Sequence, residues 1–99
     1  MHMKPEWLRE IESWAERRNE VSEVWLFGSR AKGSARDDSD IDLALILPPE
    51  NWAFANYVAF GDKWQHSLAS ALGKHVSLEA INGPELVEKV LIWRRGSSP

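Results

Sequence analysis

The sequence predicts a small α/β domain built around a mixed β-sheet. Three segments carry apolar residues at helical spacing, three shorter segments are rich in β-forming residues, and glycine or proline follows most of them. Helices that alternate with strands in this way are typical of α/β domains. The chain has 99 residues, of which 43% are hydrophobic and 27% charged. We therefore expect a single globular domain over residues 1–99.

The first half of the chain predicts one helix and two strands. Pro5 suits the first position of a helix that runs to about Arg18. The β-rich run from Val21 to Phe27 ends at a glycine, and the almost continuously apolar run from Ile41 to Leu47 ends at two prolines. A continuous apolar run is expected for a strand that is covered on both faces. The apolar positions of the helix are Trp7, Leu8, Ile11, Trp14 and Ala15.

The second half predicts a long helix, a third strand and a last helix. The long helix spans Asn51 to Leu72 and ends at Gly73, and the strand spans His75 to Ile81. The apolar stripe of the long helix is wider than one packing seam requires, so the helix is either well buried or partly in contact with a partner subunit. The last helix is predicted to begin at Asn82-Gly83-Pro84. Its inward residues would be Leu86, Val87, Val90, Leu91 and Trp93, with Arg94 and Arg95 at its C-terminus, where they complement the helix end or contact phosphate.

Composition narrows the class of protein. The net charge of −3 argues against non-specific binding to nucleic acid. The chain has no cysteine, hence no disulfide framework and no thiolate metal site, which suits the cytoplasm. No apolar run approaches the length of a membrane span, and the start lacks a signal-peptide pattern. We expect a soluble cytoplasmic protein without a membrane partner.

The loop between the first two strands carries the candidate chemistry. It opens with Gly28-Ser29 and closes with Asp40-Ile41-Asp42. In a strand, alternate side chains share a face, so the two carboxylates would lie about 6 to 7 Å apart on one face. Mg²⁺ is the ordinary cation for one or two carboxylates plus substrate phosphates. Gly28 permits close approach of the backbone to a ligand, and Ser29 precedes a short helix from Arg30 to Lys32 whose free N–H groups would bind an anion.

Each end of this loop also has a structural interpretation. A Gly-Ser pair alone is most often a plain turn, and an acidic stretch before a strand is most often a solvated loop. The two features occur at opposite ends of one loop, with basic residues between them. This combination favours a site that binds phosphate and metal.

The string GSRAKGSARDDSDIDLAL, with its G-S-x10-D-x-D spacing, resembles the minimal nucleotidyltransferase (MNT) domains of the polymerase β superfamily. The flanking elements fit that family over nearly all of the chain. The resemblance implies a polymerase β-like nucleotidyltransferase fold and Mg²⁺ held by Asp40 and Asp42. It also implies that Gly28 and Ser29 hold the phosphates of ATP or another nucleoside triphosphate. Arg30 and Lys32 would either add charge beside the triphosphate or remain solvated loop cations.

The third strand departs from the family pattern. Many relatives carry an aspartate there that completes the metal site and, in some members, acts as a base. The aligned position is Ser77, which cannot hold a metal charge, and Glu79 lies two residues further along the same face. The offset is about 6.6 Å along a strand, more than the extra methylene of glutamate spans. Glu79 is therefore a catalytic candidate only if the strand register differs, and otherwise a surface or structural residue.

The resemblance also implies a partner and a reaction. With one predicted domain, the acceptor is expected on another chain. Relatives of this size pair with helical HEPN proteins as toxin and antitoxin, and the nucleotidyltransferase adds AMP to a tyrosine of the toxin. The leading hypothesis is therefore a protein adenylyltransferase. The alternative is an antitoxin or regulatory subunit with impaired catalysis that binds nucleotide or masks its partner, which the serine at position 77 favours.

Overall fold

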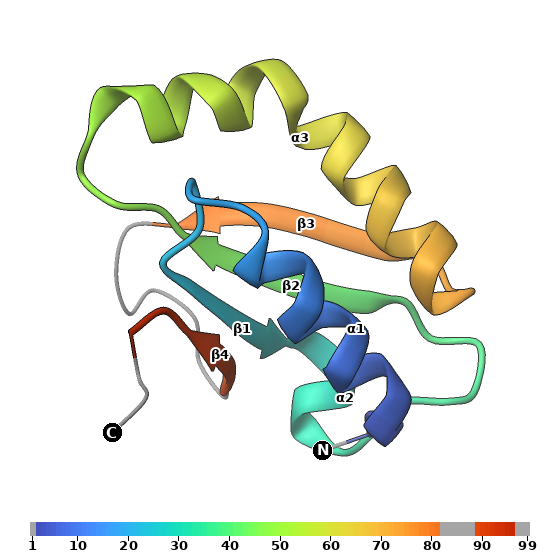
Figure 1. Cartoon of the computed structure of the whole chain (residues 1–99). Helices are drawn as coiled ribbons and strands as arrows, with labels where there is room; N and C mark the ends of the chain where they lie inside the picture. The colour runs from blue at the N-terminus through green and yellow to red at the C-terminus, as the bar shows by residue number, and fades with distance from the viewer. Residues whose placement is uncertain (1, 82–88, 97–99) are drawn as a thin grey trace.

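The computed structural model describes residues 2–81 and 89–96 (Figure 1). In this part of the chain the elements follow one another as α1 (Pro5–Glu16), β1 (Glu23–Phe27), α2 (Gly28–Lys32), β2 (Ile41–Ile46), α3 (Asn51–Leu72), β3 (Val76–Ile81) and β4 (Val90–Arg94). The prediction for the long helix is confirmed at both ends. It ends as expected at Gly73, which adopts the left-handed conformation and donates its N–H to the carbonyl of Ala69.

The sheet is mixed, as predicted, and has the strand order β3-β2-β1-β4. Strand β1 pairs in antiparallel fashion with β2 and with β4, whereas β2 and β3 are parallel. A parallel pair needs a crossover connection, which α3 supplies as it passes over the sheet (Figure 1).

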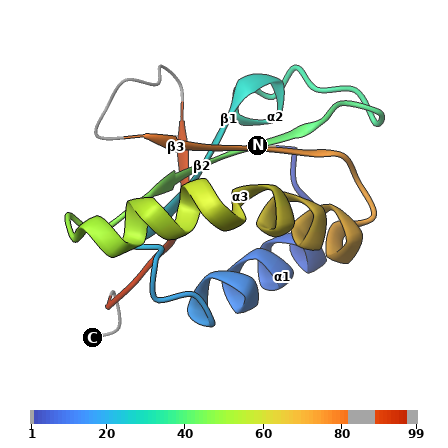
Figure 2. The same cartoon turned by 90° about the horizontal axis from the view of Figure 1, so that it is seen from above.

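Two helices cover one face of the sheet. Helices α1 and α3 lie together on this face, and the short α2 lies on the opposite side (Figure 2). Ile41, Leu43 and Leu45 of β2 are fully buried in the core between sheet and helices. The Trp14 and Trp64 rings join α1 to α3 in an edge-to-face contact with 6.1 Å between centroids. The predicted inward residues Trp7, Ile11, Trp14 and Ala15 of α1 are all buried.

Helix α3 is buried mainly along its C-terminal half. Trp64 and Leu68 are buried as predicted, together with Leu72, whereas Phe54 and Val58 are 59% and 67% exposed. The apolar surface is therefore wider than the packed stripe, and contact of its exposed part with a partner stays a prediction. Among the described residues, no helix combines the length and the apolar character that a membrane span requires.

The prediction of a final helix is wrong where the structure describes it. Val90–Arg94 forms the edge strand β4, paired with β1, while residues 82–88, including the predicted inward Leu86 and Val87, lie outside the described residues. The run Val-Leu-Ile-Trp is rich in β-branched and aromatic residues, and pairing with β1 satisfies its backbone groups. Tertiary pairing therefore decides its conformation.

The two arginines at the end of β4 have roles that follow from this correction. Arg95 reaches the end of α1 and donates hydrogen bonds to the carbonyls of Ala15, Arg18 and Val21. It thus ties the segment that follows α1 to the end of β4. Arg94 pairs with Glu23 of the neighbouring strand at 3.2 Å.

Candidate active site

The two ends of the predicted loop meet in the structure. Strand β1 pairs Phe27 with Asp42, which brings Gly28 directly beside the Asp42 side chain. Gly28 has φ of +72°, and a Cβ atom built there would lie 2.2 Å from Asp42 Oδ2. Only glycine fits this position, because a side chain would be strained and would overlap the carboxylate.

The carboxylates point to the side of the sheet opposite the two large helices. Ile41 and Leu43 are fully buried in the core beneath α1 and α3. Because side chains alternate along a strand, Asp42 and the preceding Asp40 project to the other face, where α2 lies (Figure 2). Asp40 is exposed and Asp42 is half-buried beside Gly28.

The surroundings of Asp42 disfavour its negative charge. Burial is the largest cause that raises the pKa of Asp42 above its ordinary value, followed by the charges of Asp40 and Glu79. The positive charges of Arg30 and His75 act in the opposite direction without cancelling the rise. Burial and neighbouring carboxylates therefore both disfavour the charged form of Asp42.

Ser29 and Lys32 lie on the turn that opens the loop. Ser29 is in the first turn of α2, next to Gly28, and its hydroxyl makes no hydrogen bond within the described residues. Lys32 is exposed in the last turn of the same helix. The short helix begins at Gly28, two residues before the predicted start. Phosphate binding by these residues stays a prediction.

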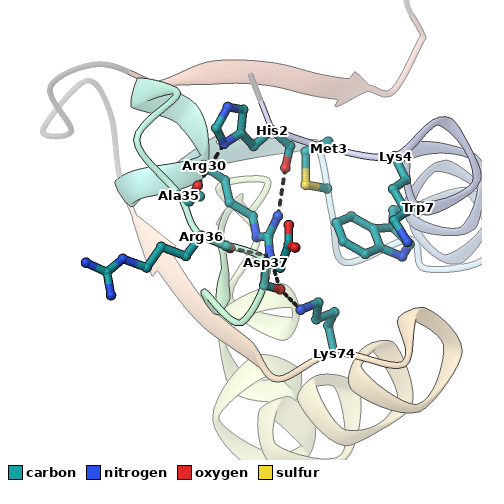
Figure 3. A pocket seen from close by; sticks show the side chains of 9 residues that line it. All are labelled: His2, Met3, Lys4, Trp7, Arg30, Ala35, Arg36, Asp37 and Lys74. Atoms are coloured by element: carbon teal, nitrogen blue, oxygen red, sulfur yellow. Dashed lines mark hydrogen bonds between the residues drawn. The ribbon is translucent and has the colours of Figure 1, made fainter.

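Arg30 is directed into the loop and away from solvent. It is 4% exposed, and its guanidinium lies 5.0 Å from the centre of the Trp7 ring (Figure 3). All of its hydrogen bonds go to backbone carbonyls, so it joins the N-terminal segment to the loop that leads into β2. The acceptors are the carbonyls of His2 at 3.0 Å, Arg36 at 3.5 Å, Asp37 at 3.3 Å and Ser39 at 2.7 Å. Phosphate binding by Arg30 stays a prediction, while its contacts give it a structural role.

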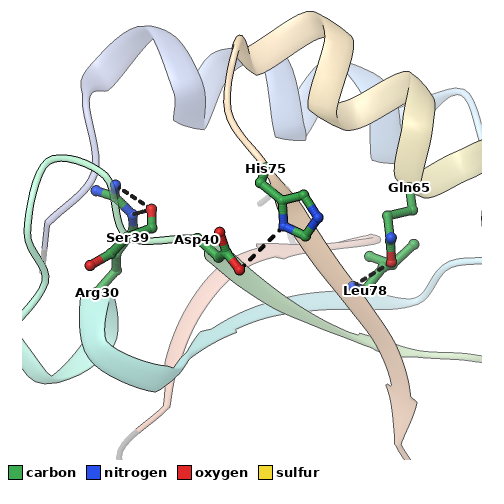
Figure 4. A network of polar contacts seen from close by, with 6 residues as sticks. All are labelled: Arg30, Ser39, Asp40, Gln65, His75 and Leu78. Carbon is green, nitrogen blue, oxygen red and sulfur yellow. Dashed lines mark hydrogen bonds and ion pairs between the residues drawn. The ribbon is translucent and has the colours of Figure 1, made fainter.

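His75 is a site residue that the sequence analysis missed. Its Nδ1 lies 3.2 Å from Asp40 Oδ2 (Figure 4). The contact follows from the parallel register in which Ile41 faces Val76, because this register brings the preceding residues of the two strands together. Only the strand register could have revealed it, since Asp40 and His75 are distant in the sequence.

The same register decides which residue of β3 lies beside Asp42. Asp42 is opposite Ser77, and Glu79 is opposite Ala44, two residues further along. In the register that the strands adopt, Ser77 thus occupies the position beside Asp42 that the sequence alignment gave to the usual aspartate. Glu79 affects Asp42 through its charge, and its catalytic role stays a prediction.

The residues at this point suit Mg²⁺. Asp40 and Asp42 place carboxylate oxygens on one face, and a cation bound there would offset both the burial and the like-charge repulsion that raise the pKa of Asp42. Within the described residues, no group of three or more histidine, cysteine, aspartate or glutamate side chains could hold a metal. Two carboxylates are nevertheless sufficient where substrate phosphates and water complete the coordination.

Comparison with protein families gives the class of this protein. A family model described as polymerase beta, nucleotidyltransferase, matches residues 9–93. Because the match spans most of the chain, the protein belongs to the polymerase β nucleotidyltransferase family. Comparison with curated protein sequences gives no significant match.

Solved structures with the same fold include toxin–antitoxin complexes. A chain of a toxin–antitoxin complex with AMP-PNP has a TM-score of 0.66 and 22% identity, over 90% of this chain and 74% of that one. A chain of the tri-AMPylated Shewanella oneidensis HEPN toxin in complex with MNT antitoxin has a TM-score of 0.58 and 21% identity, over 89% and 70%. A putative nucleotidyltransferase from Sulfolobus solfataricus has a TM-score of 0.57 and 24% identity, over 91% and 78%. Identities at this level establish the fold, which is the predicted polymerase β-like nucleotidyltransferase fold.

Proposed function

We propose that this protein transfers a nucleoside monophosphate, AMP by preference, from a nucleoside triphosphate to an acceptor hydroxyl. The observation that carries the proposal is the contact between Gly28 and Asp42, which joins the Gly-Ser turn to the Asp-x-Asp carboxylates. A triphosphate held at the turn would therefore lie beside the carboxylates. Membership of the nucleotidyltransferase family supports the same reaction class.

The residues of the site have distinct tasks in this reaction. The missing side chain of Gly28 leaves room for the Asp42 carboxylate beside the turn, and the unpaired Ser29 hydroxyl is available to donate to phosphate oxygens. Mg²⁺ held by Asp40 and Asp42 would neutralise charge on the triphosphate and orient the attacking and leaving oxygens. Arg30 fixes the loop that carries Asp40 through its bonds to the carbonyls of Asp37 and Ser39.

The transfer itself exchanges one phosphorus–oxygen bond for another. The acceptor oxygen forms a bond to the α-phosphorus as the bond to the bridging oxygen of pyrophosphate breaks, and the acceptor proton passes to water or to a nearby base. The dominant contributions are positioning and charge stabilisation, as in phosphoryl transfer generally. The site residues named above provide both.

A tyrosine of a helical HEPN partner is the acceptor that we propose. Support comes from the related complexes, in one of which the HEPN toxin carries three AMP groups. Another complex of similar fold contains AMP-PNP. ATP is therefore the preferred donor, and AMP the group transferred.

Intact-mass spectrometry of the partner tests the proposal. The protein is incubated with a candidate HEPN partner, Mg²⁺ and each nucleoside triphosphate in turn. We expect the partner to gain one or more AMP masses with ATP, and no mass when Asp40 and Asp42 are both replaced by asparagine. An unchanged partner mass with every nucleotide, although the complex still forms, would contradict transfer.

A binding module without chemistry is the second candidate function. The observation that favours it is Ser77, which stands opposite Asp42 where a third carboxylate would complete the metal site. Under this function the Asp40→Asn, Asp42→Asn double variant would still neutralise the partner in a growth assay. Loss of neutralisation in the double variant, with the complex still formed, would instead support the transferase.

A further inference from the structure

The loop between α2 and β2 has a second, basic surface on the side where the large helices lie. A hollow of about 750 Å³ is bounded there by the N-terminal segment, the loop and the turn after α3 (Figure 3). Trp7 of α1 and Lys74 after α3 line it, so it lies on the opposite side of the loop from the carboxylates of the candidate active site. Its size is within the range of small-ligand pockets.

The charged residues of this hollow are mostly cations. The lining contains Lys4, Arg30, Arg36 and Lys74, together with His2 and a single acidic residue, Asp37. In the described part of the chain, the ion pairs are His75 with Asp40 and Arg94 with Glu23, and neither is in the hollow. Lys4, Arg30 and Lys74 therefore bring three positive charges to the hollow, while the Arg36 side chain points away from it (Figure 3), in a protein whose net charge is −3.

The deepest of these cations is Arg30. It is 4% exposed and bonds only to carbonyls, and both its guanidinium and the Lys4 ammonium lie over the Trp7 ring, at 5.0 Å and 5.3 Å from its centre. A buried charge is usually paired with an opposite charge, because desolvation is otherwise costly. Two like charges beside one ring also repel each other, and an anion bound in the hollow would offset this positive charge.

We propose that this hollow binds a small ligand with two or more phosphate groups. Several cations brought from separate segments suit a multiply charged phosphate, which accepts many charge-assisted hydrogen bonds. Free pyrophosphate and the phosphates of a nucleotide share this chemistry. The hollow shares Arg30 with the loop of the proposed transferase site, but binding there does not depend on transfer.

The site would act on the loop that enters β2. His2 contacts the carbonyl of Ala35, and Lys74 donates to the carbonyl of Asp37, so the loop already forms one wall of the hollow. Asp40 follows three residues later in the sequence. A ligand that draws Lys4 and Lys74 together would hold this loop against the N-terminal segment.

The test is a pyrophosphate titration followed by two-dimensional amide NMR and calorimetry, with EDTA and about 0.15 M salt to remove metal and screen non-specific contacts. We expect saturable binding with shifts at Lys4, Ala35 and Lys74 rather than at Gly28 and Ser29. Pyrophosphate should bind more tightly than inorganic phosphate. ATP that shifts the same amides would identify a nucleotide as a second source of the phosphates.

Two matched pairs of lysine variants test whether the cations of the hollow bind pyrophosphate. Replacing Lys4 and Lys74 together by glutamine should raise the dissociation constant for pyrophosphate about tenfold. Replacing Lys63 and Lys89, which lie over Phe60 and Trp25 elsewhere on the surface, should change it less than twofold. Equal effects of the two pairs, shifts confined to Gly28 and Ser29, or no saturable binding would overturn the proposal. Thermal melts confirm that each variant is folded.

Discussion

Gly28 shows at the level of one residue how the backbone and the chemistry depend on each other. Its φ of +72° favours glycine, and the Asp42 carboxylate occupies the space that a Cβ would take. Gly33 has a similar φ of +81°, but no atom lies within 4 Å of the Cβ position there. A substitution of Gly33 therefore introduces backbone strain alone, whereas a substitution of Gly28 introduces both strain and overlap with Asp42.

Gly28→Ala should cost more stability than Gly33→Ala and should also abolish activity. Gly33→Ala removes only the freedom to adopt positive φ, at about 1 kcal/mol, whereas Gly28→Ala adds the overlap with Asp42. Urea unfolding gives the two free energies, and the transfer assay gives the activities. Equal losses of stability and activity in both variants would show that the contact with Asp42 has no role.

Asp42→Asn should stabilise the fold at neutral pH while removing activity. The pKa of Asp42 is raised in the folded protein, so folding favours its protonated form. The contribution of Asp42 to the free energy of unfolding is therefore fully present at pH values below its ordinary pKa of 3.8, and it is lost as the pH rises through the raised pKa. The asparagine variant should lack this loss, and its melting temperature without Mg²⁺ should exceed that of the wild type at pH 7.

A series of melts with and without Mg²⁺ checks this prediction. Added Mg²⁺ should raise the melting temperature of the wild type and leave that of Asp42→Asn nearly unchanged, because the cation relieves the same repulsion. A variant less stable than the wild type at neutral pH without metal would contradict the account of Asp42.

At the scale of elements, the loop between α2 and β2 depends on Arg30. Its side chain bonds to carbonyls on both sides of the loop, and its replacement would leave several of them without a donor. Arg30→Met should therefore lower the free energy of unfolding by about 2 to 4 kcal/mol. Arg36→Met, at an exposed position of the same loop, should change it by less than about 0.5 kcal/mol. Chemical denaturation measures both, and similar small effects would show that the loop does not need this anchor.

The parallel pair β2 and β3 gives a prediction about the third carboxylate. Ser77 faces Asp42, so Ser77→Asp would place a new carboxylate beside the site. We expect Ser77→Asp to reach half of its maximal thermal stabilisation at a lower Mg²⁺ concentration than the wild type. Ser77→Asn is the neutral control of similar size. An aspartate that leaves the Mg²⁺ dependence unchanged would show that position 77 is too far from the bound metal.

Local signals explain what the sequence predicted well at this scale. The spacing from Gly28 to Asp42 and the bounds of α3 depend on short-range periodicity and turn residues, which a single sequence contains. Strand β4 was missed because Val90 to Trp93 suits a helix or a strand, and its pairing with the distant β1 decides between them. The contact between His75 and Asp40 was missed for a related reason, since neither segment alone determines the register in which the two strands pair.

At the scale of the whole molecule, the two faces of the sheet have different tasks. Helices α1 and α3 close one face over the core, and α2 lies on the other (Figures 1 and 2). Strand alternation directs Asp40 and Asp42 to the face of α2, because Ile41 and Leu43 are buried beneath the large helices. An acceptor hydroxyl must therefore approach from the side of α2.

The transfer of label from the α-phosphate tests the central claim most directly. The protein is incubated with the proposed HEPN partner, Mg²⁺ and ATP labelled at either the α- or the γ-phosphorus. We predict that α-label becomes attached to the partner, that γ-label does not, and that the Asp40→Asn, Asp42→Asn variant transfers neither. Attachment of γ-label, or equal α-labelling by the double variant, would contradict nucleotidyl transfer at the site formed by Gly28, Ser29, Asp40 and Asp42.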